Sequence, residues 1–263
     1  MKLYRIWGLT LRYLFLFKHS LDRMSDAFFW PTVDIVLWGM TSSFFAKNLE
    51  GDSGEMLILG LLGGIILWIF PWRSQYEIAV NLLEDLWNRN LVNIFVSPVK
   101  FIEWVTALLL LGVGKALISF VYASALIYLL YSANILSVGL VLVPWAVLLI
   151  MFGWVFGLLV AGIIMHYGTK IQTLAWTSIY IVAPFAAVYY PVSSLPAWAQ
   201  SVAHFVPASY VFEAMRAAVG GSPLPLSDLL WPTILCLIYF TAALVLIRHS
   251  FHHILKRGLI SVD

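Results

Sequence analysis

Long runs of apolar residues, each close in length to the thickness of a bilayer, constrain this chain more than any other feature. A helix crosses the hydrocarbon core with about 20 mostly apolar residues. Six segments approach or exceed this length, and we expect the second to continue past Arg73 as one longer helix. The six are Ala27–Ala46, Met56–Trp72, Trp104–Tyr131, Val138–Met165, Ile171–Tyr190 and Leu229–Ile247.

The composition supports a membrane protein. Hydrophobic residues make up 62% of the chain and charged residues 11%, and the mean hydropathy is +0.93. Soluble domains contain about 45–50% apolar and about 25% charged residues, and a soluble fold of this length could not bury the excess. Because the apolar runs are continuous and do not alternate, they predict helices and not a barrel. The predicted fold class is an all-α integral membrane protein with six transmembrane helices.

The distribution of Lys and Arg predicts the orientation. Twelve of these residues lie in the N-terminal segment, the second and fourth loops and the tail, whereas only Lys47 and Arg216 lie on the opposite side. Cytoplasmic segments carry the excess of Lys and Arg in membrane proteins. We therefore expect both termini in the cytoplasm, which agrees with an even number of spans.

The N-terminal segment 1–26 has an amphipathic pattern. Arg5, Arg12, His19 and Arg23 fall in one narrow sector of a helical wheel, and most apolar residues lie elsewhere. This pattern predicts a helix lying in the cytoplasmic interface of the membrane. A basic flank that only fixes the topology is the alternative.

Polar residues recur at helical spacing after the second span. Glu77, Asn81, Glu84, Asp85 and Asn88 follow this spacing, with leucines between them. We interpret region 77–98 as a helix that leaves the membrane and offers a docking surface to a cytoplasmic partner. An ordinary soluble loop is the other interpretation.

Prolines and aromatic residues alternate in segment 191–226, which lies between the last two spans. The prolines exclude one continuous helix. We therefore expect two short helices, Pro196–His204 and Ser209–Val219, that dip into the outer leaflet as a re-entrant segment. Glu213 and Arg216 are three residues apart, and inside the leaflet their charges would need to pair.

Two ionisable residues lie inside predicted spans, Asp34 in the first and Lys115 in the third. Charged groups in a membrane are costly and often functional. They are candidates for a polar pathway and for a mutual ion pair. In the alternative interpretation Asp34 lies near the interface, and Lys115 reaches towards water or pairs with backbone carbonyls.

Motifs for catalysis, nucleotide binding and metal binding do not occur in the sequence. It contains no G-x-x-x-x-G-K-[ST] loop, no H-E-x-x-H pattern and no G-x-S-x-G elbow. We therefore expect no catalytic residue, no bound cofactor or metal, and no ATPase site of its own. The formal charge of +2 gives no reason to expect nucleic acid as a partner.

Two motifs resemble those of a known family. Leu195-Pro-Ala-Trp198, followed by Pro207 and by Glu213-x-x-Arg216 before the last span, is similar to the signature of type-2 ATP-binding-cassette (ABC) exporter permeases. Segment 90–98 resembles the cytoplasmic loop of that family, which ends in Ser/Thr-Pro. Length, six spans and cytoplasmic termini also match.

The resemblance implies a permease subunit that exports a hydrophobic, lipid-linked or glycan substrate across the cytoplasmic membrane of a bacterium. Two identical copies would pair with two copies of a separate ATPase subunit, which would bind ATP and Mg. Region 1–26 would be an interfacial elbow helix, 27–247 the transmembrane domain and 248–263 a cytoplasmic tail. The implied coupling residues are Glu77, Asn81, Glu84, Asp85, Asn88, Arg89, Asn90, Asn93, Ser97 and Pro98. The implied outer gate comprises Pro191, Pro196, Trp198, Pro207, Glu213 and Arg216.

Two other classes of function compete with this hypothesis. An integral membrane enzyme acting on lipids would need convergent His, Asp or Cys side chains at one membrane face, and the sequence shows no clear set. A channel or secondary carrier would predict several charges within the membrane or an inverted repeat. The sequence offers two such charges and no obvious repeat. Neither the substrate nor the identity of the second permease copy follows from the residues.

Overall fold

A computed structural model describes residues 1–47, 53–134, 139–222 and 224–257. Val138, where the fourth predicted span begins, Pro223 of the predicted re-entrant segment and residues 258–263 of the predicted tail lie outside these ranges. The described residues form α-helices and short 3-10 turns, and they contain no strand. The all-α prediction is confirmed for this part of the chain.

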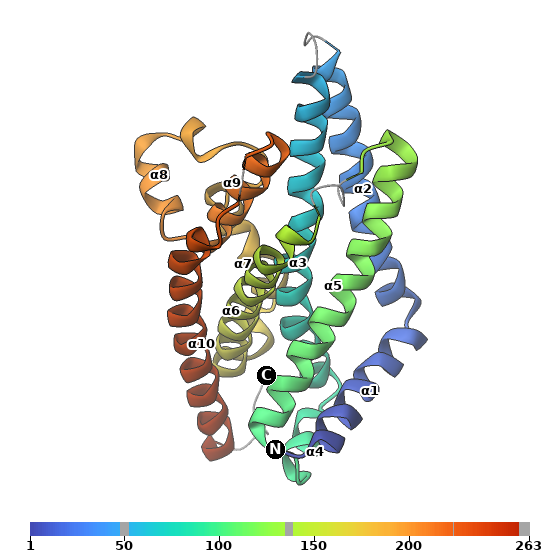
Figure 1. The fold of residues 1–263 in the computed structure, drawn as a ribbon. Coiled ribbons are helices and arrows are strands. Elements are labelled where there is room, and N and C mark those ends of the chain that lie inside the picture. Colours follow the sequence, from blue (N-terminus) through green and yellow to red (C-terminus); the bar gives the residue numbers. More distant parts are fainter. Residues whose placement is uncertain (48–52, 135–138, 223, 258–263) are drawn as a thin grey trace.

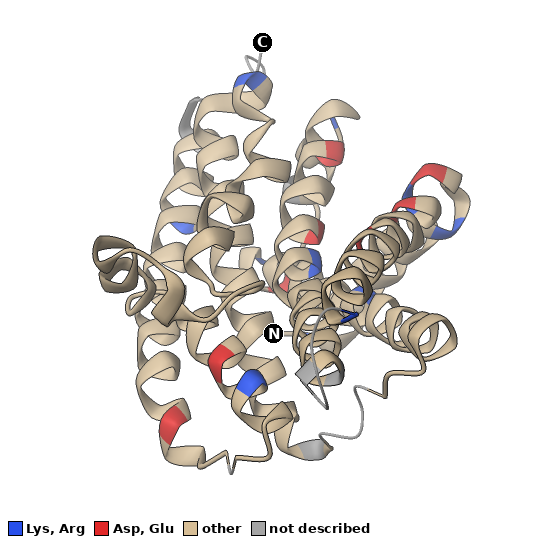
Figure 2. Cartoon of the chain, turned by 90° about the horizontal axis from the view of Figure 1, so that it is seen from above, with Lys and Arg blue, Asp and Glu red and all other residues tan. Residues whose placement is uncertain are grey.

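The helices pack side by side as an elongated bundle (Figure 1). The N-terminus and α4 lie at one end, called the α4 end below, whereas α8 and α9 lie towards the opposite end. Lys, Arg, Asp and Glu colour only a small part of the ribbon (Figure 2). The helices are α1 Leu3–His19, α2 Leu21–Ala46, α3 Ser53–Trp87, α4 Leu91–Val96, α5 Phe101–Tyr131, α6 Val143–Tyr167, α7 Leu174–Val182, α8 Ala197–Ala203, α9 Pro207–Val219 and α10 Leu230–Arg257.

Helix α3 lies at the centre of the bundle, where it packs against α2, α5, α6 and α7. Helix α6 lies between α3 and α10, and two glycines of its Gly153-Trp-Val-Phe-Gly157 stretch bring it close to α3. A Cβ atom at Gly153 would lie 2.7 Å from Cβ of Ser74, and one at Gly157 would lie 2.7 Å from Cδ1 of Ile78. Because helices in a membrane associate through close packing of small residues, these glycines fix the α3–α6 interface.

Four of the described helical stretches are long and apolar enough to cross a membrane: Met56–Trp87, Phe101–Tyr131, Val143–Ile171 and Leu226–Ile254. They correspond to the second, third, fourth and sixth predicted spans. The second span continues past Arg73 to Trp87, as expected. Helix α2 contains the first predicted span and has 26 residues, but it is not one of these four. The count of six spans stays a prediction.

The fifth predicted span, Ile171–Tyr190, is not one long helix. Only Leu174–Phe185 forms a continuous apolar helical stretch. Twelve residues at about 1.5 Å each reach about 18 Å, less than the roughly 30 Å hydrocarbon core. Pro184 lies in the 3-10 turn Ala183–Phe185, and Ala187 then adopts a φ of 60°. The chain therefore turns before the predicted end of the span.

The N-terminal amphipathic helix is shorter than predicted. Helix α1 ends at His19, and Ser20 has an extended backbone that separates it from α2. The Ser20 hydroxyl oxygen accepts a hydrogen bond from the Arg23 amide at 3.4 Å, as an N-cap does. Arg23, which was predicted to lie on the interfacial helix, therefore belongs to α2.

The two short helices expected in segment 191–226 are present. Helix α8 spans Ala197–Ala203, and α9 spans Pro207–Val219 with its proline in the first turn, where a missing amide hydrogen costs nothing. The predicted tail is helical as far as the structure describes it, because α10 runs to Arg257. Phe251 of this part packs against Phe101 of α5, with ring centroids 4.7 Å apart.

Candidate functional site

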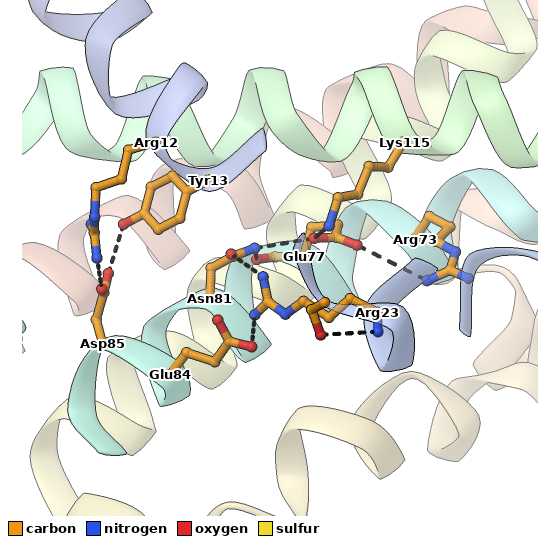
Figure 3. Close-up of polar contacts among 10 residues, drawn as sticks. Arg12, Tyr13, Arg23, Arg73, Glu77, Asn81, Glu84, Asp85 and Lys115 are labelled. Atoms are coloured by element: carbon orange, nitrogen blue, oxygen red, sulfur yellow. Dashed lines mark hydrogen bonds and ion pairs between the residues drawn. The ribbon is translucent and has the colours of Figure 1, made fainter. Parts of the chain in front are cut away.

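The polar stripe of α3 is buried inside the bundle. Glu77, Asn81 and Asp85 are spaced four residues apart, so they share one face of the helix. Each of the three is at most 2% exposed, whereas Glu84 is partly exposed. This face contacts α1, α2 and α5 (Figure 3). The prediction that the stripe is a docking surface for a partner is therefore wrong for these three residues.

Glu77 lies at the centre of the buried network. Its Oε2 atom accepts a hydrogen bond from Nζ of Lys115 on α5 at 2.6 Å and one from Nδ2 of Asn81 at 3.1 Å. Its Oε1 atom lies 4.0 Å from the guanidinium of Arg73. Removal of these charges from water is costly, so the pair is tolerated because hydrogen bonds surround it. The Lys115 ammonium also lies 4.2 Å from the ring centre of Phe17.

Two arginines connect this network to α2. Arg73 on α3 donates to Oδ2 of Asp26 at 2.9 Å and also to the Asp26 carbonyl. Arg23 on α2 forms an ion pair with Glu84, and its Nη1 atom donates to Oδ1 of Asn81 at 3.1 Å. Three cations and three carboxylates therefore bind α2, α3 and α5 together.

Asp85 connects three parts of the α4 end. Its carboxylate accepts hydrogen bonds from Arg12 at 2.5 Å and from the Tyr13 hydroxyl at 2.7 Å, both on α1. The Asp85 backbone carbonyl accepts from the Asn90 amide at 2.8 Å, just before α4. Burial, together with the Asp85 charge, raises the pKa of Tyr13 far above its usual range. The phenol therefore stays protonated and keeps its role as a donor.

Glu103 fastens the start of α1 to the start of α5. Its carboxylate accepts the backbone amide of Lys2 at 2.7 Å and that of Lys100 at 2.9 Å. The guanidinium of Arg5 lies 3.7 Å away and donates to the carbonyl of Pro98. The two segments that flank α4 are thus held to the N-terminal helix.

The part of region 77–98 that is open to a partner is its tip. Arg89 adopts a φ of 51°, which turns the chain between α3 and α4. Pro98 cannot donate a backbone hydrogen bond, and α4 ends just before it. Of the predicted coupling residues, the tip exposes Asn88, Arg89, Asn93 and Pro98, while Asn90 and Ser97 are partly exposed. Val92 and Val96 add exposed apolar surface at 38% and 82%.

Two of the predicted outer-gate residues, Glu213 and Arg216, form an ion pair towards the opposite end of the bundle. Oε1 of Glu213 accepts hydrogen bonds from Arg216 at 2.8 Å, which confirms the expected pair, and from the Val192 amide at 2.7 Å. Arg216 also donates to the Ala187 carbonyl at 2.8 Å. The pair thus holds both ends of the turn 187–192 against α9. Of the other gate residues, Pro207 is buried in the first turn of α9, and Pro191, Pro196 and Trp198 are partly or fully exposed.

Asp34 and Lys115 do not form the ion pair suggested by their positions in the sequence. Lys115 is 3% exposed and binds Glu77. Asp34 is exposed on the surface of the single chain. The sequence did contain the true partner, since Glu77 lies in the predicted polar stripe. The spacing predicts that stripe in the cytoplasm, away from the depth of Lys115, so it does not indicate Glu77 as the counter-charge.

Several residues of the network were not predicted, namely Arg12, Tyr13, Arg23, Asp26, Arg73 and Glu103. The first four lie in segment 1–26, whose pattern predicts an interfacial helix with its basic residues facing the membrane surface. A signal was present, because the carboxylates of α3 exceed the cations on the same helix and require partners elsewhere. Among the described residues, no group of three His, Cys, Asp or Glu side chains is arranged to hold a metal ion.

These features define a multi-pass helical membrane protein. It has a buried charged network towards the α4 end, and a turn, 187–192, bound by Glu213 and Arg216 towards the other end. The family model of ABC-2 type transporters matches residues 15–219. The chain belongs to the ABC-2 type transporter family, which confirms the resemblance seen in its motifs. It is a permease, the membrane component of an ABC transporter, and this family implies a partner ATPase subunit. No curated protein matches the sequence.

Proposed function

We propose that this chain is half of the membrane part of an ABC exporter. Two identical copies form the membrane part in the cytoplasmic membrane of a bacterium, with both termini and the α4 end in the cytoplasm. Two copies of a separate ATPase subunit bind ATP and Mg and drive the transport of a hydrophobic, lipid-linked or glycan substrate outward. The distribution of Lys and Arg supports this orientation.

The observation that carries the proposal is the exposed tip around α4. Val92, Asn93 and Val96 leave apolar and uncharged surface open on a helix of only six residues. A soluble partner that covers this tip would shield the apolar side chains from water. The tip, rather than the buried stripe of α3, is the docking element for the ATPase.

The connections behind the tip explain how a push on α4 reaches the membrane. The Asn90 amide is bound to Asp85, and Asp85 holds α1 through Arg12 and Tyr13. On the other side of α4, Glu103 binds the starts of α1 and α5. A displacement of α4 therefore moves α1, α3 and α5 together and can switch the two permease copies between inward-open and outward-open arrangements.

The turn 187–192 acts as the outer closure in this proposal. Glu213 and Arg216 bind it from α9, and exposed aromatic residues of the neighbouring segment, Trp198 and Phe205, present apolar surface to the outer leaflet. Lipids of that leaflet are the expected surroundings of α8.

A charge placed on the tip tests the docking role. We expect Val92→Asp to abolish co-purification of the ATPase subunit and ATP-dependent transport, because it places a carboxylate in an apolar contact. Val92→Thr is the matched control, since it keeps the shape of the side chain at the same site and adds no charge. This control variant should retain the ATPase.

The measurement uses tagged full-length chain purified from its native membranes, with the bound ATPase identified by mass spectrometry and by ATP hydrolysis. Equal recovery of an active P-loop ATPase with Val92→Asp and wild type would place the docking surface elsewhere. Full transport activity of the purified chain without any ATPase would refute the function itself. Uptake into inside-out vesicles, but not into right-side-out vesicles, would support the export direction.

A further inference from the structure

Asp34 carries a carboxylate inside the first predicted span and faces outward from the single chain. It lies eight residues beyond Asp26 on α2, which corresponds to about 12 Å along the helix axis. Among the ion pairs of the described residues, none includes Asp34. An ionised carboxylate at this depth requires a counter-charge.

The cations of the buried network are already used. Arg23 binds Glu84, Arg73 binds Asp26 and Lys115 binds Glu77, so the buried network is balanced without Asp34. Arg73 and Lys115 are 1% and 3% exposed. A second identical copy would bring the same cations, each bonded in the same way. Neither network leaves a cation for Asp34, so a cationic ligand would supply its counter-charge.

Aromatic side chains flank this carboxylate on α2. Trp30 and Trp38 lie one turn before and one turn after Asp34 on the same face of the helix. Trp38 stacks on Tyr189, with ring centroids 4.7 Å apart and planes 20° apart. Trp30 is 49% exposed, so its ring is open to a ligand.

A carboxylate among aromatic rings has the chemistry of a site for organic cations. The faces of Trp and Tyr rings attract a cation, and they also provide apolar surface for the groups attached to it. An anionic or strongly hydrated ligand would gain nothing from this arrangement. A small inorganic cation would not use the rings.

We propose that Asp34, with Trp30, Trp38 and Tyr189, binds the charged group of a lipophilic organic cation. The proposal deepens the exporter function, because it names the substrate class as hydrophobic molecules with a quaternary or protonated amine or a related cationic centre. Within that function, α2 contributes the substrate-contacting face of the permease.

The test compares two probes of nearly equal size and shape but opposite charge, tetraphenylphosphonium and tetraphenylborate. Their binding to the purified full-length chain in nanodiscs is measured by equilibrium dialysis. We expect Asp34→Asn to weaken tetraphenylphosphonium binding roughly tenfold or more, because it removes the counter-charge. Binding of tetraphenylborate should stay the same or become stronger.

Two further variants serve as controls. Asp22→Asn removes the same charge from an exposed position on the same helix, and it should leave the binding of both probes unchanged. Asp34→Glu keeps the charge and should retain binding within about threefold of wild type. Equal loss in Asp34→Glu and Asp34→Asn would assign the effect to packing and overturn the proposal.

Equal tetraphenylphosphonium binding by wild type and Asp34→Asn would also overturn it. Loss of the dimer in Asp34→Asn, with probe binding unchanged, would show that a second copy is the occupant of this face. These binding results do not depend on the ATPase. If the wild-type chain recruits no ATPase, the exporter function is refuted, but the cation site is not. If the chain is an active exporter without charge selectivity, only the cation site is refuted.

Discussion

The ion pair between Glu77 and Lys115 allows the strongest prediction about stability. Both side chains are 3% exposed, and the oxygen and nitrogen lie 2.6 Å apart between α3 and α5. Glu77→Gln keeps the shape of the side chain and its ability to accept from Asn81, but it leaves the Lys115 ammonium without its carboxylate. Lys115→Met removes the cation and leaves a buried carboxylate.

The size of the effect follows from the cost of an uncompensated buried charge. Removal of one partner from a buried ion pair costs about 3–5 kcal/mol. We therefore expect each single variant to lower the free energy of unfolding by about that amount. The double variant removes both charges, so it should be more stable than the sum of the single effects predicts, with a coupling energy of about 1–3 kcal/mol.

Unfolding in mixed micelles by titration with a denaturing detergent, followed by tryptophan fluorescence, measures this cycle. Glu84→Gln is the control, because its ion pair with Arg23 is more open to solvent, with 25% of the Glu84 side chain exposed. That variant should lose about 1 kcal/mol or less. Single effects that simply add in the double variant would refute the reasoning, since they would show that the two charges do not stabilise each other.

Three other predictions concern packing, the outer turn and the α1 contact. Gly153→Ala should lower the free energy of unfolding by about 1–3 kcal/mol, because its new methyl group would clash with α3. Gly114→Ala is the control, since there is open space around Gly114, and it should be neutral or stabilising by up to about 1 kcal/mol. Arg216→Met should release the Ala187 carbonyl and speed limited proteolysis in the turn that follows, and a digestion pattern identical to wild type would contradict this. Tyr13→Phe should lower the free energy of unfolding by about 1–3 kcal/mol in the same detergent titration, because the buried Asp85 carboxylate loses a hydrogen-bond donor. An unchanged midpoint would contradict the hydrogen bond between Tyr13 and Asp85.

The helices with a local signal in the sequence were predicted well, because apolar length and proline positions act within a single segment. Four long apolar helices, the continuation of the second one past Arg73 and the two short helices after Pro196 all follow from apolar length and proline positions. The Glu213–Arg216 pair was also predictable, since residues three apart on a helix lie side by side. The break at Ser20 was missed because amphipathic periodicity continues across it.

The charged network could not be predicted from spacing alone. Glu77 and Lys115 are far apart in the sequence, and only the packing of α3 against α5 brings them together. The polar stripe was predicted to lie in the cytoplasm, because polar residues at the end of a span are usually exposed to water. Here α1 packs against α5, and its Arg12 and Tyr13 side chains bind Asp85 of α3, so this end of the stripe is covered by protein instead.

The network and the glycine contacts together limit where motion can occur in the proposed exporter. Asp85 and Glu103 fasten α1, α4 and the start of α5 to α3, while Gly153 and Gly157 hold α6 close to α3. Since interdigitated cores resist continuous deformation, a push on α4 cannot readily be absorbed inside the chain. We therefore expect each copy to move largely as one body, and the change between inward-open and outward-open states to arise between the two copies. Asp34 takes part in no ion pair among the described residues, and the switch can alter the surroundings of the face that carries it.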